Sequence, residues 1–356
     1  MVRVLVAGRY RLGEPLGRGG MGEVLQGFDE VLGRQVAVKL LLGDDGDDSA
    51  ATRFRMEAQT AARLNHPNVV AAYDFGEWEG RFYLVMELVQ GPSLAAELTA
   101  QGTLPVRRVA ALAAQAASGL AAAHRQGVVH RDVKPGNLMV DTGTGALKIG
   151  DFGIARFVDE TSAGLTRAGQ IVGTSTYLAP ERALGRTAGP ESDVYALGCV
   201  LYQLLVGRPP FWSENPTTLL YMHVDSPPVP PRGQRPDLPC AFETFLLRML
   251  AKQPEDRPSA QEAAEFFGGE AWRDRPQPLP QARQEPLPGP AVPPMPSAPP
   301  GVPPALQRET TTTYALPSAR QARPAAAVFR RPQLVMGALA GVVVFCLAAM
   351  VGAVLF

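Results

Sequence analysis

The sequence has few cysteines and no excess of either charge. Its 356 residues include only Cys199, Cys240 and Cys346, and no CxxC pair. This scarcity excludes a disulfide framework and a cysteine zinc site, and it is typical of a protein in a reducing compartment. Lysine plus arginine and aspartate plus glutamate each number 34, so the formal net charge is zero. No overall electric field therefore favours a nucleic acid as partner.

The N-terminus lacks a secretion signal, whereas the C-terminus holds a long apolar run. The apolar stretch within MVRVLVAGRY is too short for a signal peptide. Residues 334–356 include no charged side chain, and as a helix they would cover roughly 34 Å, enough to cross a bilayer core. Arg330 and Arg331 precede this run. The apolar run therefore predicts a single-pass transmembrane helix in the cell membrane, and the positive-inside rule predicts that the preceding domain lies in the cytoplasm.

The C-terminal part also suggests partners. Gly337 and Gly341 have the GxxxG spacing that allows two membrane helices to pair, which would give a homodimer. Residues 273–332 are so rich in proline that they predict a disordered juxtamembrane linker. A passive spacer and a PxxP ligand for a partner domain are both open interpretations. The stretch ETTTTY at 309–314 is either plain polar linker or, when phosphorylated, a site for phosphothreonine-binding partner domains.

The part before the linker predicts an α+β protein with two lobes. Residues 10–90 read as short strands rich in valine and leucine, interrupted by one helical segment at 53–64. Residues 91–268 read mostly as helices, because apolar side chains recur there at i, i+3 and i+4, as in 94–101, 106–127 and 193–207. A small β-rich lobe with one main helix, followed by a larger and mainly helical lobe, places a cleft between the two.

The small lobe contains a glycine-rich motif and a lysine within an apolar strand. LGRGGMGEV at 16–24 has the spacing GxGxxG, in which glycines let a hairpin lie close to phosphate groups. A dinucleotide-binding fold would continue into a helix, whereas here the strand RQVAVKLL follows. Lys39 in that strand needs an anionic partner, since lysine is rarely buried alone. Glu57 on the predicted helix can supply it.

The large lobe begins with a dense polar stretch, HRDVKPGN at 130–137, which follows two valines. A second acidic motif, Asp-Phe-Gly, comes at 151–153 after the predicted strand ALKI. Together they supply two carboxylates and an amide, the oxygen ligands that Mg²⁺ prefers. This pattern indicates a loop with a chemical function and a metal site.

Five motifs now stand in order: GxGxxGxV, VAVK, HRDxxxxN, DFG and, at 179–181, Ala-Pro-Glu. They resemble the signature of bacterial eukaryotic-like (Hanks-type) serine/threonine protein kinases. The resemblance covers residues 10–268 and implies the two-lobed protein kinase fold, with a small lobe of about 10–90 and a large lobe of about 91–268. It implies an enzyme that uses ATP with Mg²⁺, or alternatively Mn²⁺, to phosphorylate serine and threonine hydroxyls of protein substrates, with autophosphorylation in signal transduction.

The resemblance also implies roles for single residues. Asp132 would accept the substrate hydroxyl proton and Lys134 would neutralise the transferred phosphoryl group. Asn137 and Asp151 would bind the metal, while the pair of Lys39 and Glu57 would hold the α- and β-phosphates. The expected ATP-binding residues are Leu16, Gly17, Gly19, Gly22, Val24, Ala37, Lys39, Glu87, Val89 and Met139. Met86 would correspond to the family's gatekeeper residue. The apolar residues of this set can equally be interpreted as ordinary core residues.

Regulation is expected in the segment between DFG and APE. Arg131 would pair with a phosphorylated residue of this segment, for which Thr166 is the first candidate among its six serines and threonines. Ala168 stands two positions after Thr166, so the doubly phosphorylated TxT switch of some relatives is not expected. Thr174 would contact Asp132 and Lys134.

The resemblance further predicts a buried pair between Glu181 and Arg257, a brace from Asp193 to the HRD backbone, and a packing role for His130. The other histidines receive no role. Two rival interpretations are a nucleotide-sensing pseudokinase, although no catalytic position is missing, and an adaptor that works through its Pro-rich tail.

Overall fold

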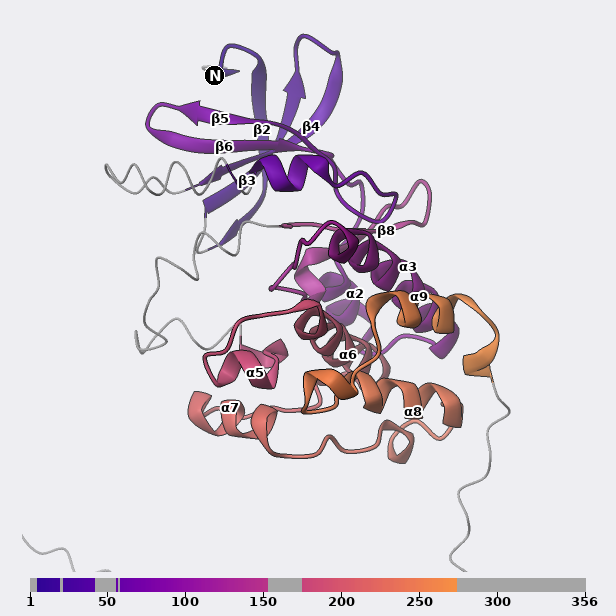
Figure 1. The fold of residues 1–356 in the computed structure, drawn as a ribbon. Helices are drawn as coiled ribbons and strands as arrows, with labels where there is room; N and C mark the ends of the chain where they lie inside the picture. Colours follow the sequence, from indigo (N-terminus) through magenta and orange to yellow (C-terminus); the bar gives the residue numbers. More distant parts are fainter. Residues whose placement is uncertain (1–4, 20–21, 42–55, 57, 153–174, 274–356) are drawn as a thin grey trace, which may run out of the picture. The chain divides into compact units, whose positions relative to one another are not determined.

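The computed structural model describes residues 5–19, 22–41, 56, 58–152 and 175–273. Figure 1 shows a β-sheet at one end of this part and a group of helices at the other. The bounds of the sheet strands are β1 Leu5–Val6, β2 Tyr10–Gly19, β3 Gly22–Asp29, β4 Arg34–Leu41, β5 Ala72–Trp78 and β6 Arg81–Met86. The larger helices are α2 Leu94–Gln101, α3 Val106–Arg125, α6 Pro190–Val206, α7 Pro216–Val224, α8 Cys240–Met249 and α9 Ala260–Gly268. This arrangement confirms the expected division into a β-rich and a helical lobe.

The six strands form one sheet in the order β1-β2-β3-β4-β6-β5, and all neighbours are antiparallel. Strand β4 is buried along most of its length because apolar side chains fill both of its faces. Residues 58–63 are helical, as the pattern predicted for this region. Strand β1 was not predicted, since two residues are too few to show an alternating pattern.

The helical lobe is built around α6. Its apolar residues occur on every side, and nearly all are buried, as expected for a helix inside a core. Helix α3 contacts α6 and α9. Its buried face is rich in alanine, whose short side chain lets neighbouring helices pack closely. The predicted helices at 94–101 and within 106–127 and 193–207 are therefore confirmed.

Two short strands of the helical lobe lie beside the connection that enters the sheet. Strands β7 (Leu138–Val140) and β8 (Leu147–Ile149) form an antiparallel pair. The backbone of β8 is hydrogen-bonded to the segment that leads to β5. Ile149 N donates to Asn68 O at 2.9 Å, and Val70 N donates to Ile149 O at 2.9 Å. These bonds tie the helical lobe to that connection.

No helix within residues 5–273, over the described stretches, is long and apolar enough to cross a bilayer. The predicted transmembrane segment 334–356 and the linker beyond Arg273 lie outside the described residues.

Candidate active site

The glycine-rich motif forms the hairpin of β2 and β3, as predicted. Gly17 pairs with Val24 and Gly19 with Gly22, while residues 20–21 lie outside the described part. Gly22 has φ 140°, and a Cβ there would lie 2.1 Å from Leu40 O, so only glycine fits. A Cβ on Gly17 would meet nothing within 4 Å. The backbone needs glycine at Gly22, whereas Gly17 leaves open space beside the hairpin.

Lys39 projects from β4 and pairs with Asp151, the first residue of the DFG motif. The residue is 4% exposed, and its Nζ lies 2.8 Å from Asp151 Oδ1. A carboxylate partner compensates the cost of burying the ammonium group. The expected partner Glu57 lies outside the described residues, so that ion pair stays a prediction. Asp151 also has positive φ, at 60°, which indicates a strained backbone at this point.

The polar loop at 130–137 brings Asp132, Lys134 and Asn137 together. Lys134 Nζ lies 2.7 Å from Asp132 Oδ2, and Asn137 Nδ2 donates to Asp132 O at 2.8 Å and to Oδ2 at 3.2 Å. Within the described part of the chain, Asp132 Oδ1 has no hydrogen-bond partner. One oxygen is thus held by two neighbours while the other can accept a proton from outside.

His130 lies beneath this loop, as predicted. It is 0% exposed and its ring packs edge-on against Phe152, with centroids 4.6 Å apart. Nε2 lies 2.8 Å from Gly150 O and must donate, while Nδ1 accepts from Asp132 N at 3.2 Å. Both ring nitrogens are therefore engaged in one neutral tautomer, which leaves no lone pair for general-base chemistry.

Asp193, at the start of α6, holds the loop from the other side. Its carboxylate is buried and accepts from His130 N and from Arg131 N, each at 2.8 Å. Arg131 has φ 68°, a conformation that costs a non-glycine residue energy unless other contacts enforce it. The predicted brace is confirmed. His124, to which no role was given, supplies a third bond through Nε2 to Asp193 Oδ2 at 2.8 Å.

Asn137 and Asp151 are suited to hold a divalent cation. The Asn137 amide uses its NH₂ group on Asp132, so its oxygen points elsewhere and accepts no bond among the residues described. The backbone ties the two ligands together, since Gly150 N donates to Asn137 O at 2.8 Å. Oxygen donors of this kind fit Mg²⁺. No group of three or more His, Cys, Asp or Glu side chains gathers as a metal site in the described ranges, so this pair is the candidate.

The segment after β6 offers backbone groups near buried apolar side chains of β4 and β6. Glu87 N donates to Ala71 O at 2.9 Å, but neither Glu87 O nor Val89 N has a partner in the structure as described. Ala37 and Met86 face each other across β4 and β6. Both are buried, whereas Leu16 is 53% exposed at the hairpin. Glu87 O is a hydrogen-bond acceptor and Val89 N a donor, and buried apolar side chains lie near them. This combination suits a flat ring that carries one donor and one acceptor on its edge.

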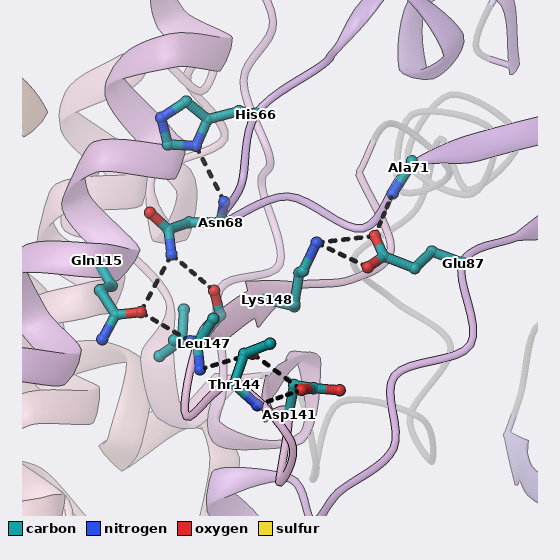
Figure 2. A network of polar contacts seen from close by, with 10 residues as sticks. His66, Asn68, Ala71, Glu87, Gln115, Asp141, Thr144, Leu147 and Lys148 are labelled. Atoms are coloured by element: carbon teal, nitrogen blue, oxygen red, sulfur yellow. Dashed lines mark hydrogen bonds and ion pairs between the residues drawn. The ribbon is translucent and has the colours of Figure 1, made fainter.

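The Glu87 side chain is fixed by a contact that the sequence did not reveal. Figure 2 shows Lys148 of β8 reaching Glu87, with Nζ at 2.7 Å from Oε1 and 2.9 Å from Oε2. Ala71 N also donates to Glu87 Oε2 at 3.2 Å. In the same network Asn68 Nδ2 donates to Leu147 O at 2.9 Å. The connection between the lobes is therefore held by β8 from two sides.

Four other expected site residues have mixed outcomes. Val24 lies opposite Lys39 in the sheet, and Met139 of β7 lies against Gly150, where a Cβ would meet its methyl group at 2.7 Å. Thr166 and Thr174 lie outside the described residues, so their roles stay predictions.

Glu181 and Arg257 form the predicted buried pair. Arg257 Nη2 lies 2.8 Å from Glu181 Oε2, and Nη1 lies 2.9 Å from Oε1, in a bidentate arrangement. Burial raises the pKa of Glu181, but hydrogen bonds from Arg257 and Ser192 outweigh it, and the pKa stays below its ordinary value. The pair fixes the APE segment to the turn that precedes α9.

Comparison with known proteins agrees with this geometry. Residues 10–266 match the family described as protein kinase domain. The chain is 45% identical over 254 residues to the serine/threonine-protein kinase PknB of Mycolicibacterium smegmatis, covering 70% of this chain and 40% of that protein. It is 44% identical over 254 residues to PknB of Mycobacterium tuberculosis H37Rv, with the same coverage of 70% and 40%.

A third relative is a probable serine/threonine-protein kinase of Corynebacterium efficiens, 42% identical over 262 residues, or 71% of this chain and 40% of that protein. The chain thus spans about 40% of the length of the curated relatives that it matches. The family match covers most of the chain and includes the loop, the paired lysine and the buried Glu181–Arg257 contact. The chain therefore belongs to the protein kinase family and resembles its bacterial serine/threonine-type members.

Proposed function

We propose that this protein transfers the γ-phosphoryl group of ATP to serine and threonine hydroxyls of proteins. The observation that carries the proposal is the loop in which Asp132, Lys134 and Asn137 converge while Lys39 and Asp151 meet beside it. Phosphoryl transfer needs little covalent help from a protein, so it depends on positioning and on charge stabilisation. Each of these five side chains supplies one of those two effects.

Asp132 Oδ1, which has no partner among the described residues, accepts the proton of the substrate hydroxyl as the hydroxyl oxygen bonds to the γ-phosphorus. The bond between the γ-phosphorus and the β–γ bridging oxygen breaks in the same transfer, and ADP leaves. Lys134, already within 2.7 Å of the same carboxylate, lies where it neutralises charge on the transferred group. Lys39 holds the α- and β-phosphates. Asn137 and Asp151 would hold magnesium or manganese, whose positive charge would offset the negative charge of the phosphates.

The nucleotide base would lie between the apolar walls near Ala37 and Met139. Glu87 O accepts from the exocyclic amine of adenine and Val89 N donates to its ring. Gly17 gives the open space for phosphate oxygens beneath the hairpin. Leu16, exposed on the hairpin, covers the base once nucleotide is present.

A transfer assay with γ-labelled ATP and a generic basic protein tests the proposal. Wild-type protein should label the substrate, and Asp132→Asn should bind a fluorescent nucleotide normally while labelling falls at least about a thousandfold, as for loss of a main catalytic group. Binding without transfer by the wild type would favour the pseudokinase interpretation. Absence of both would leave the adaptor interpretation, in which the Pro-rich segment carries the function.

Regulation and placement follow as further parts of the proposal. Phosphate on Thr166, added by another copy of the kinase, pairs with Arg131 and orders the segment around it. Residues 334–356 anchor the kinase domain to the cytoplasmic face of the cell membrane, and pairing through Gly337 and Gly341 brings two copies together for that reaction. Phosphothreonine in 309–314 recruits partner domains.

A further inference from the structure

We propose that residues 269–273 form a clip that fastens the end of the helical lobe and that opens separately from the rest of it. The clip follows α9 and includes the short turn η5 (Ala271–Arg273), the last coloured stretch of chain in Figure 1. The family match ends at residue 266, so the clip lies beyond the part of the chain that the family accounts for. The predicted linker begins at residue 273, so the clip is also the point where that linker joins the lobe.

One buried side chain holds the clip in place. Trp272 is 5% exposed, and its ring meets the Phe242 ring edge-on, with centroids 6.1 Å apart and an interplanar angle of 85°. Edge-to-face contact is a favoured arrangement of two aromatic rings, and an indole buries a large apolar area. In contrast, the side chains of Glu270 and Arg273 pair with each other and are 74% and 46% exposed. The attachment of the clip therefore depends on Trp272.

The contacts of Phe242 show what the clip joins. Phe242 is in the first turn of α8 and Phe267 is in the last turn of α9, and their ring centroids are 4.9 Å apart. The start of α8 therefore lies beside the end of α9. At their other ends, the two helices are connected by the turn that carries Arg257. The clip thus closes one end of this helix pair, while the contact between Arg257 and Glu181 holds the other.

The clip can open while the helices stay in place. Trp272 is the one buried residue of 269–273, whereas α9 has buried residues of its own along its length. Trp272 Nε1 is also buried and has no hydrogen-bond partner among the described residues. An unsatisfied buried donor reduces the free energy gained by burying the indole. These features are typical of a local unit that opens at a lower free energy than the whole domain.

The test uses full-length protein with Trp272→Ala, Trp272→Phe and Arg273→Ala. Hydrogen exchange at the backbone amides of α8 and α9 measures opening of the clip, and exchange in β4 reports unfolding of the whole domain. We expect the amides at the start of α8 to exchange at least about tenfold faster in Trp272→Ala, because a large buried ring is lost. Exchange in β4 should be unchanged.

Two variants serve as controls. Trp272→Phe keeps an aromatic ring against Phe242 and removes the unpartnered N–H, so exchange in α8 should stay within about threefold of wild type. Arg273 is the neighbour of Trp272, and its guanidinium carbon lies 5.1 Å from the centroid of the indole ring. A cation over an exposed part of a ring contributes little. Arg273→Ala should therefore also stay within about threefold of wild type.

Free indole gives a second measurement. The space left by Trp272→Ala lies between apolar side chains of α8 and α9, and a cavity of this kind can bind an apolar ligand of matching shape. Indole should slow the exchange of α8 in Trp272→Ala toward the wild-type rate and should not change the exchange of wild-type protein. An absence of this slowing would contradict the binding pocket for Trp272.

The other outcomes are equally decisive. Unchanged exchange of α8 in Trp272→Ala, or exchange in Trp272→Phe as fast as in Trp272→Ala, would show that the aromatic ring does not hold the clip. Equal acceleration in α8 and β4 would show that Trp272 belongs to the core of the whole domain, and it would overturn the separate opening. None of these measurements requires phosphoryl transfer, so the result does not depend on the proposed kinase function.

Discussion

Removal of Arg257 should destabilise the large lobe more than any loss of a surface ion pair. Its side chain is 0% exposed and that of Glu181 is 7% exposed. Besides the bidentate pair, Arg257 donates to three carbonyl oxygens, those of Ala251, Glu191 and Lys252, at 2.8, 3.0 and 2.9 Å. In Arg257→Ala the Glu181 carboxylate loses both guanidinium bonds and keeps the neutral donors Ser192 Oγ and its own backbone N–H. An uncompensated buried charge of this kind costs about 3–5 kcal/mol.

This loss of about 3–5 kcal/mol is a large part of the whole free energy of unfolding, which is about 5–15 kcal/mol for a domain. Urea unfolding followed by tryptophan fluorescence, to which the buried Trp272 of the large lobe contributes, measures this loss of stability. Arg257→Met combined with Glu181→Leu removes both charges and should recover most of the loss, because no charge is then left buried. A cost below about 1 kcal/mol for Arg257→Ala, or a double variant as unstable as the single one, would refute the reasoning.

The pH dependence has a defined sign. Wild-type Glu181 has its pKa below the ordinary 4.5, so its contribution to stability is present above that pH and is lost as the pH falls through the lower, folded-state pKa. In Arg257→Ala, burial is the largest remaining effect on this group; it is opposed by the bonds from Ser192 Oγ and the Glu181 backbone N–H, and we expect it to raise the pKa of Glu181 above its ordinary value. Folding then favours the protonated acid, and the variant gains stability as the pH falls. The stability gap between wild type and variant should therefore narrow on acidification toward pH 4.

Gly22→Ala should destabilise the small lobe by at least about 2 kcal/mol, because the added Cβ would meet a carbonyl oxygen and the residue has positive φ. Gly17→Ala should unfold like wild type and should raise only the KM for ATP. Equal melting temperatures for the two variants would contradict this prediction. Lys148→Met should raise the KM for ATP about threefold with little change in kcat, because Glu87 loses the ion pair that holds its side chain and steadies its backbone. Steady-state measurements of KM and kcat test this prediction. Mass spectrometry of active protein should find phosphate on Thr166, and Arg131→Ala should abolish the gain in activity on phosphorylation. Full-length protein should stay in the membrane pellet after an alkaline wash, and its recovery in the supernatant without detergent would exclude the anchor.

Local patterns determined the elements of the fold. Apolar residues that recur at i, i+3 and i+4 form a pattern within a short stretch of chain. The sequence alone therefore predicts helices α2, α3 and α6. The glycine spacing likewise predicts the hairpin of β2 and β3. The ordered motifs identified the family, because their residue types and separations are specific in combination. The pair of Glu181 and Arg257 came from that resemblance and not from any local pattern.

Tertiary structure alone decided which distant side chains meet. Lys39 reaches Asp151, 112 positions away, and Lys148 reaches Glu87, 61 positions away. His124 is 69 positions from Asp193, and nothing near it in the sequence distinguishes it from an ordinary histidine at the end of a helix. Periodicity reports which face of an element is buried, but the partner on that face depends on how whole elements pack. The sequence therefore determined the lobes and the motifs of this member of the protein kinase family, while the packing of α3 against α6 decided that His124 meets Asp193.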